Sequence, residues 1–90
     1  MSKKASGFEA DHPLVRVTWR DTAGRGRWHT IEDAETLEPA ICVSVGWILR
    51  DDAEVMTIAA SRDGETSVMD SNTFPKVCVL TVEHLRVKKY

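Results

Sequence analysis

Apolar residues alternate with small or polar ones over several short stretches of the chain, which is the pattern of half-buried β-strands. In the stretch Ile41 to Leu49, the odd positions are all apolar and the even positions are mostly small. The alternation breaks after Leu49 and resumes from Glu54 to Arg62. These two stretches predict an antiparallel hairpin.

Three more stretches have strand character. Leu14 to Arg20 alternates strictly, with valines and a tryptophan on one face. The Asp63-Gly64 pair predicts a tight turn before a short strand over Thr66 to Met69. A polar loop is expected from Asp70 to Thr73, and a last apolar strand from Val77 to Val82.

The long connection after the first strand carries a helix signal. Thr30 is a suitable N-cap because Asp33 follows three residues later. Ile31, Ala34 and Leu37 then recur at helical spacing until Pro39, which predicts one short helix.

Together these elements predict a mostly β fold, a small SH3/Sm-like five-stranded antiparallel barrel with one short helix in the long first connection. An open sheet packed on the short helix, with edges that pair between subunits, is the alternative. We expect a flexible N-terminal tail over residues 1–12, a single domain over 13–86 and a basic C-terminal tail over 87–90.

Composition narrows the class of protein. Ninety residues with 42% hydrophobic and 29% charged content form one ordinary globular domain. Such a small core gains stability from association, so we expect a homo-oligomer. No apolar stretch has the roughly 20 residues of a membrane helix and no signal sequence is evident, which predicts a cytoplasmic protein with no membrane partner. The net charge of −2 makes nucleic acid a less favoured partner.

Catalytic and metal-binding patterns are missing from the sequence. Cys42 and Cys78 lie far apart inside apolar strands, which favours buried, reduced thiols over a disulfide or a metal site. The histidines have no ligand spacing, and the adjacent carboxylates Asp51 and Asp52 should point apart on a turn. We therefore predict a binding protein without a cofactor rather than an enzyme.

The loop after the first strand is the strongest candidate for a ligand site. It places Arg20, Arg25 and Arg27 beside Trp28. Guanidinium groups bind phosphate oxygens, and an indole offers a flat face on which a base can stack. The alternative is that Trp28 folds back to cap the barrel while the arginines only solubilise the loop.

Trp47 and its neighbours are further candidates. Trp47 lies on an apolar strand face, so it belongs either to the core or to a barrel mouth or subunit interface. Gly46 indicates either a bulge or the close approach of a ligand or a second backbone. Ser61 and Arg62 end the second strand of the predicted hairpin and would lie at the rim of a site.

A pattern of strands and tryptophans covers Leu14 to Leu85 and resembles short proteins encoded by tailed bacteriophages and prophages. The resemblance rests on Val15, Val17, Trp19, Asp21, Trp28, Val45-Gly46-Trp47-Ile48-Leu49, Ile58-Ala59-Ala60-Ser61 and Phe74-Pro75-Lys76. It implies an accessory protein in the cytoplasm of the bacterial host, in a context where small phage proteins counter immunity. Its pattern contains no catalytic motif.

These observations lead to one predicted function and two alternatives. We expect a non-enzymatic anti-defence sponge that sequesters a small anionic nucleotide, with the arginines on phosphate and Trp28 or Trp47 on the base. A protein-interaction module that blocks a host protein is the first alternative. An Sm-like binder of RNA or single-stranded DNA, supported only by the basic ends of the chain, is the second.

Overall fold

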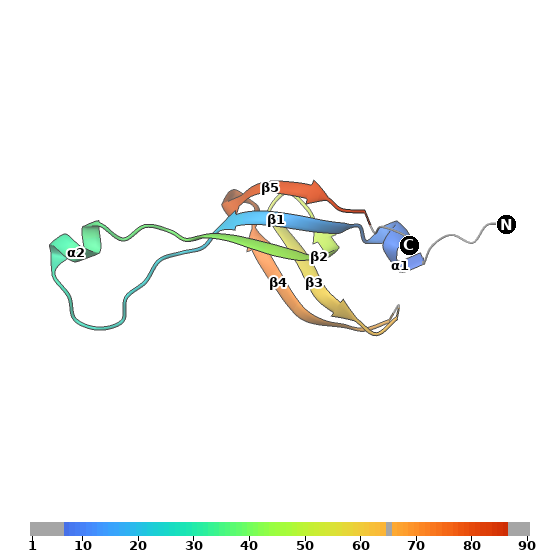
Figure 1. The fold of residues 1–90 in the computed structure, drawn as a ribbon, viewed down its shortest axis with the longest axis horizontal. Helices are drawn as coiled ribbons and strands as arrows, with labels where there is room; N and C mark the ends of the chain where they lie inside the picture. Colours follow the sequence, from blue (N-terminus) through green and yellow to red (C-terminus); the bar gives the residue numbers. More distant parts are fainter. Residues whose placement is uncertain (1–6, 65, 87–90) are drawn as a thin grey trace.

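The computed structural model describes residues 7–64 and 66–86, and its main feature is one five-stranded antiparallel sheet in the order β4-β3-β2-β1-β5 (Figure 1). The strands are β1 (Leu14–Arg20), β2 (Ile41–Asp51), β3 (Val55–Arg62), β4 (Val68–Pro75) and β5 (Val79–His84). The helices are α1 (Gly7–Asp11), α2 (Ile31–Glu35) and the 3-10 turn η1 (Lys76–Cys78). The predicted mostly β, five-stranded antiparallel class is confirmed.

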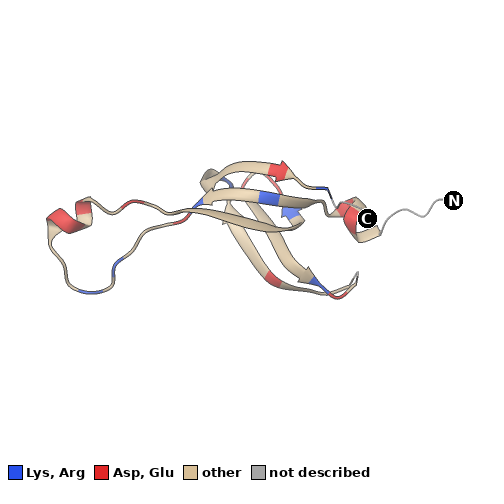
Figure 2. Ribbon diagram, in the orientation of Figure 1, with Lys and Arg blue, Asp and Glu red and all other residues tan. Residues whose placement is uncertain are grey.

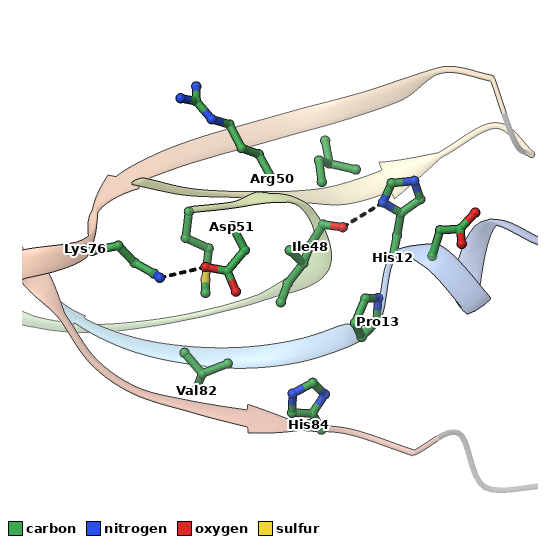
Figure 3. Close-up of a pocket in the computed structure, with 11 residues that line it drawn as sticks. His12, Pro13, Ile48, Arg50, Asp51, Lys76, Val82 and His84 are labelled. Atoms are coloured by element: carbon green, nitrogen blue, oxygen red, sulfur yellow. Dashed lines mark hydrogen bonds and ion pairs between the residues drawn. The ribbon is translucent and has the colours of Figure 1, made fainter. Parts of the chain in front are cut away.

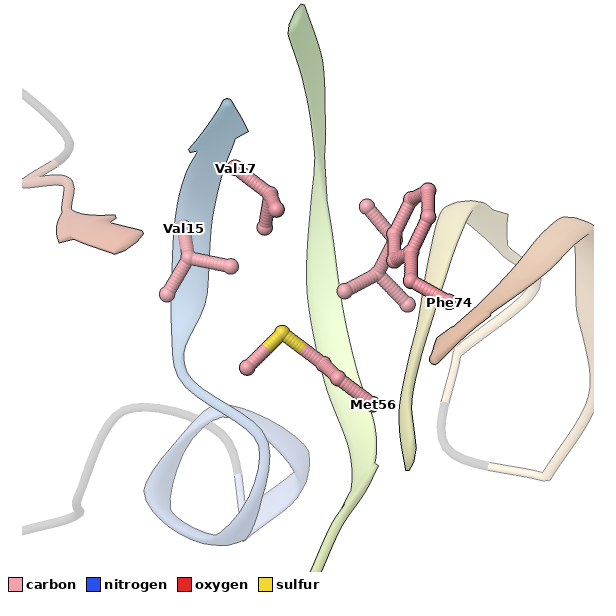
Figure 4. Close-up of a cluster of buried hydrophobic side chains, with 5 residues drawn as sticks. Val15, Val17, Met56 and Phe74 are labelled. Atoms are coloured by element: carbon pink, nitrogen blue, oxygen red, sulfur yellow. The ribbon is translucent and has the colours of Figure 1, made fainter. Parts of the chain in front are cut away.

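The sheet curls so that strands distant in its order share one core. Val15 and Val17 of β1 are fully buried against Met56 of β3 and Phe74 of β4 (Figure 4). The rings of Trp19 and Phe74 lie 4.6 Å apart, which joins β1 directly to β4. The strands thus form a small barrel-like fold, although β4 and β5 remain the two ends of the hydrogen-bonded sheet.

The two faces of β2 are used in a way that the alternation did not predict. Its small side chains Cys42 and Ser44 are partly buried, and Trp19 Nε1 donates a hydrogen bond to Ser44 Oγ at 3.0 Å. The interior beside β2 is already filled by Trp19 and Phe74, so only small residues fit there. The larger apolar residues Ile41, Val43 and Val45 therefore lie on the exposed face.

Gly46 is where a second backbone approaches β2. A Cβ atom at this position would lie 2.5 Å from the carbonyl oxygen of Ala59 and 2.9 Å from its carbonyl carbon. Trp47 pairs with Ala59 at the first step of the β2–β3 ladder, so the two strands converge at this point. Of the interpretations of Gly46, the structure supports close approach of a second backbone.

The N-terminal region differs from the expected tail. Residues 7–11 form α1, and Phe8 is buried. Its ring lies 4.5 Å from the ring of His12 and 6.0 Å, edge to face, from Trp47. One aromatic residue in a polar segment was enough to dock the helix, a contact that local composition did not predict. Residues 1–6, and the predicted basic tail 87–90, lie outside the described residues.

Strand β4 runs through the segment for which a polar loop was expected. Ser71, Asn72 and Thr73 pair with β3 in continuous antiparallel register, and the hydroxyl oxygens of Thr57 and Thr73 lie 2.8 Å apart. Pairing with β3 overrides the low strand propensity of Asn72. Asp70 adopts a φ of 60°, which an aspartate tolerates better than most residues.

The turn between β2 and β3 is held by Asp52, which makes it sensitive to acid. The backbone N–H groups of Val55 and Glu54 donate to Asp52 Oδ1, and Arg50 donates to Oδ2. These bonds, with the backbone donors first, lower the pKa of Asp52 from 3.8 to about 2. Because the folded pKa is depressed, the stabilisation is present above about pH 4 and is lost as the pH falls through 2.

We expect the Asp52→Asn variant, which keeps an acceptor oxygen but cannot be protonated, to lose less stability than the wild type between pH 4 and pH 2. Parallel chemical denaturation across that pH range measures the difference, and NMR titration of the Asp52 carboxyl should give a midpoint near 2. Identical acid profiles for the two proteins would contradict the role given to this carboxylate.

Candidate functional site

The connection between β1 and β2 forms an arm, residues 21–40, that projects beyond the sheet and carries α2 (Figure 1). The predicted helix is confirmed: Thr30 caps it, and its hydroxyl oxygen accepts a hydrogen bond from the backbone N–H of Asp33 at 3.0 Å. At the base of the arm, the N–H of Asp21 donates to the carbonyl oxygen of Ala40. The hydrogen bonds that the structure gives to residues 21–40 all join residues of the arm itself.

The arm is exposed along almost its whole length. Trp28 is 99% exposed and Ile31 is 79% exposed, and only Leu37 in the arm is partly buried. A five-residue helix has little stability of its own in water. These two large exposed apolar side chains make the arm a candidate binding surface.

Charges divide the arm into two parts (Figure 2). The loop before the helix carries Arg25 and Arg27, and the helix carries Glu32, Asp33 and Glu35. Arg25 Nη1 and Asp33 Oδ2 lie 3.9 Å apart, a solvent-exposed pair that contributes little to stability. The basic residues therefore precede Trp28 in the loop, and the acidic residues follow it on the helix.

The predicted ligand-binding residues fall into two separate groups. Arg25, Arg27 and Trp28 lie in the arm, and Gly26, Arg27, Trp28 and His29 line a shallow hollow there. Arg20 is the last residue of β1, at the base of the arm. The remaining three, Trp47, Ser61 and Arg62, belong to the body of the sheet.

Trp47 and Arg62 meet at α1, which lies at the opposite end of the molecule from α2 (Figure 1). The Arg62 guanidinium carbon is 4.7 Å from the centre of the Phe8 ring and 5.1 Å from that of Trp47. Arg62 also forms an ion pair with Glu9 at 3.3 Å. Cation–π contacts of this kind fix α1 on the sheet.

This cluster is a packing contact and not an open stacking surface. Trp47 Nε1 and Arg62 Nε are buried, and neither has a hydrogen-bond partner among the described residues. The Trp47 indole and the Arg62 guanidinium both contact Phe8 of α1. The structure therefore does not bring Trp47 and Arg62 together with the arm residues in one site.

A cavity of about 520 Å³ opens at the end of the sheet near Pro13 (Figure 3). Its wall includes the apolar residues Ile48, Met56 and Val82, and its rim includes histidines and charged residues. Its size lies within the range of small-molecule pockets. Among the described residues, no aromatic side chain other than histidine lines it, so this part of the chain gives it no stacking face of the kind that a nucleotide base prefers.

The polar groups around this cavity bind one another. Lys76 Nζ lies 2.7 Å from Asp51 Oδ1 and donates to the carbonyl oxygen of Asp52 at 2.9 Å. His12 Nδ1 lies 2.9 Å from the carbonyl oxygen of Ile48. These contacts occupy Lys76, Asp51 and one ring nitrogen of His12.

Two features of the surface were not predicted from the sequence. One is the 79% exposure of Ile31 at the start of α2. The other is the apolar row Ile41, Val43 and Val45 on β2. The signal for the second was available in the small even positions of β2, which match a crowded interior better than an exposed face.

Metal and redox chemistry gain no support from the residues that the structure describes. Cys42 and Cys78 are free and partly buried. Within residues 7–64 and 66–86, no group of three or more histidine, cysteine or acidic side chains could hold a metal ion. None of the helices in this part of the chain has the length and apolar character needed to cross a membrane.

The fold and surface define a small β-barrel-like protein with a projecting arm. No protein-family model, curated protein or solved structure matches the chain. The resemblance to proteins of tailed phages and prophages therefore stays a prediction.

Proposed function

We propose that the protein is a non-enzymatic binding module whose arm, residues 21–40, recognises a partner protein. The observation that carries this proposal is the 99% exposure of Trp28 on a segment with no hydrogen bonds to the sheet among those described. Burying a tryptophan side chain removes about 150–250 Å² of its surface from water, so the indole alone is a strong anchor. Of the two main predicted functions, this geometry favours the protein-interaction module.

The residues around Trp28 have the composition of an interface centre. Tryptophan and arginine are among the residues most enriched among those that dominate binding energy, and Arg25 and Arg27 come just before Trp28 in the loop. Ile31, the first residue of α2, is a second large apolar side chain exposed on the arm. The matching partner surface is an apolar pocket for the indole with carboxylates at its rim.

The Trp28→Ala variant should lose its partner while keeping its fold. We expect wild-type protein, used as bait in the cells that encode it, to retain one protein in stoichiometric amount, and Trp28→Ala to retain at least about tenfold less. Quantitative mass spectrometry of the retained proteins measures this ratio.

The matched control is Val77→Ala, because Val77 is also an apolar residue that is 92% exposed, but it lies on η1. It should retain the partner as the wild type does. Equal retention by the Trp28→Ala protein, or no stoichiometric partner for the wild type, would overturn the proposal.

Nucleotide sequestration is the second candidate, favoured by the hollow that Gly26, Arg27, Trp28 and His29 line. The same variants test it, because a base stacked on Trp28 quenches its fluorescence in the wild type and cannot do so in Trp28→Ala. Titration with cyclic dinucleotides and ADP-ribose derivatives supports sequestration if one of them binds in the micromolar range. If none of these nucleotides binds, nucleotide sequestration is excluded.

A further inference from the structure

The first half of β2 is a free edge of the sheet. The β2–β3 ladder begins at the pair Trp47↔Ala59, whereas β1 pairs with β2 from Ile41 onward. Residues 41–46 therefore have β1 on one side and no paired strand of the described residues on the other.

The backbone of this edge directs its hydrogen-bonding groups outward at alternate residues. Asp21 N–H donates to Ala40 O, and Ile48 N–H donates to Pro13 O, in the same β1–β2 register. In an antiparallel ladder, hydrogen-bonded residues alternate with residues whose N–H and C=O point the other way. The backbone groups of Ile41, Val43 and Val45 thus point away from β1.

The same three residues carry the exposed apolar row. Their side chains are 57%, 60% and 48% exposed, respectively. Residues 41–46 contain no charged residue and no proline, although natural sheet edges are normally protected by such residues. An unprotected, apolar edge with free backbone groups is the kind of surface that pairs with another strand.

The edge is complementary to itself about Val43. If two copies pair antiparallel with Val43 on the two-fold axis, Ile41 of each lies opposite Val45 of the other. Each such pair can exchange two hydrogen bonds, and the apolar side chains meet on one face.

The limits of the free edge fit this register. Pro39 would lie opposite Trp47 of the other copy, whose outward backbone groups already pair with Ala59. Proline has no N–H to donate, so the intermolecular ladder ends where β3 of the other copy begins. Residues 41–45 of one copy can therefore pair along their whole length with the same residues of a second copy.

We propose that the protein forms a two-fold dimer by pairing the β2 edges of two copies over residues 41–45. The result is a continuous six-stranded sheet, β5-β1-β2-β2-β1-β5, across the axis. The contact does not involve the tip of the arm, so dimer formation and partner binding through Trp28 fail independently.

The Val43→Lys variant tests the proposal because it places two lysines directly opposite each other on the axis. Like charges in that position are destabilising, and we expect dimer dissociation to become at least about tenfold more favourable. Sedimentation velocity over a concentration series should show a dimer for the wild type and a monomer for this variant. Val77→Lys, the same change at an exposed valine on η1, should leave the dimer intact.

Cysteine cross-linking tests the register and does not depend on the lysine variant. In a Cys42→Ser, Cys78→Ser background, Val43→Cys should form an intermolecular disulfide on mild oxidation, since Cα atoms of a hydrogen-bonded pair lie about 5.5 Å apart. Ile41→Cys should not, because the two copies of residue 41 are separated by four residues of strand, roughly 13 Å.

Three outcomes overturn the proposal: a monomeric wild type, a dimer that Val43→Lys leaves unchanged, or cross-linking through Ile41→Cys that equals that through Val43→Cys. The first excludes self-association, the second places the contact on another face, and the third excludes the register.

Discussion

Replacing Phe74 by alanine should lower the free energy of unfolding by about 3–5 kcal/mol, the largest effect expected for a single truncation in this protein. Phe74 is 3% exposed and contacts the ring of Trp19 across the interior. Its ring lies with Met56 and the valines of β1, so its removal leaves a cavity where β1 and β4 meet. The loss is a large fraction of the total stability of native proteins, about 5–15 kcal/mol.

Denaturant unfolding followed by far-UV circular dichroism measures this change. Trp28→Ala is the control, because it also deletes an aromatic ring but from a side chain that is 99% exposed. Its free energy of unfolding should change by less than about 0.5 kcal/mol. Similar losses for the two variants would contradict the assignment of Phe74 to the core and of Trp28 to the surface.

A methyl group added at Gly46 should cost about 1–3 kcal/mol or more, because it enters the space of a backbone and not of a flexible side chain. The added Cβ would lie 2.5 Å from the carbonyl oxygen of Ala59. Relieving this contact requires β2 and β3 to separate at the start of their ladder. The Gly46→Ala variant should therefore unfold at a lower denaturant concentration.

Gly24→Ala provides the comparison, since a Cβ at Gly24 would meet no atom within 4 Å. It should be neutral or slightly stabilising, because alanine restricts the unfolded chain more than glycine does. A Gly46→Ala protein as stable as Gly24→Ala would show that the two strands do not converge as described.

Most of the fold could be predicted from local pattern. The first strand agrees with its prediction over Leu14–Arg20, and Thr30 caps the predicted helix. These elements depend on alternation and on capping chemistry, which act between near neighbours in the sequence. The strand over Asp70–Thr73 and the docking of Phe8 depend on contacts with distant residues, so no local signal indicated them.

The candidate site was predicted in part, for a similar reason. Arg25, Arg27 and Trp28 are adjacent in sequence and remain adjacent in the arm. Trp47 and Arg62 were grouped with them on residue type alone, but the fold places both at α1. Residue chemistry predicts which groups can bind a ligand, whereas the path of the chain decides which of them meet.

For β2, the alternation of apolar and small residues correctly predicted a strand, but it did not predict which face of the strand is buried. Alternation identifies a strand but does not say which of its two faces is inside. Trp19 and Phe74 fill the interior, and the smaller face of β2 is the one that fits beside them. The row Ile41, Val43 and Val45 is exposed as a consequence.

The self-contained bonding of the arm separates what the protein recognises from what keeps it folded. Because the hydrogen bonds given for residues 21–40 close within the arm and residues 24–36 are all exposed, we expect changes of sequence over 24–36 to leave the packing of the strands unchanged. The sequence of the arm can therefore diverge quickly in evolution. For the same reason, the arm can be replaced by another loop in an engineered variant. We expect related chains to keep their strands while diverging most between the ends of β1 and β2.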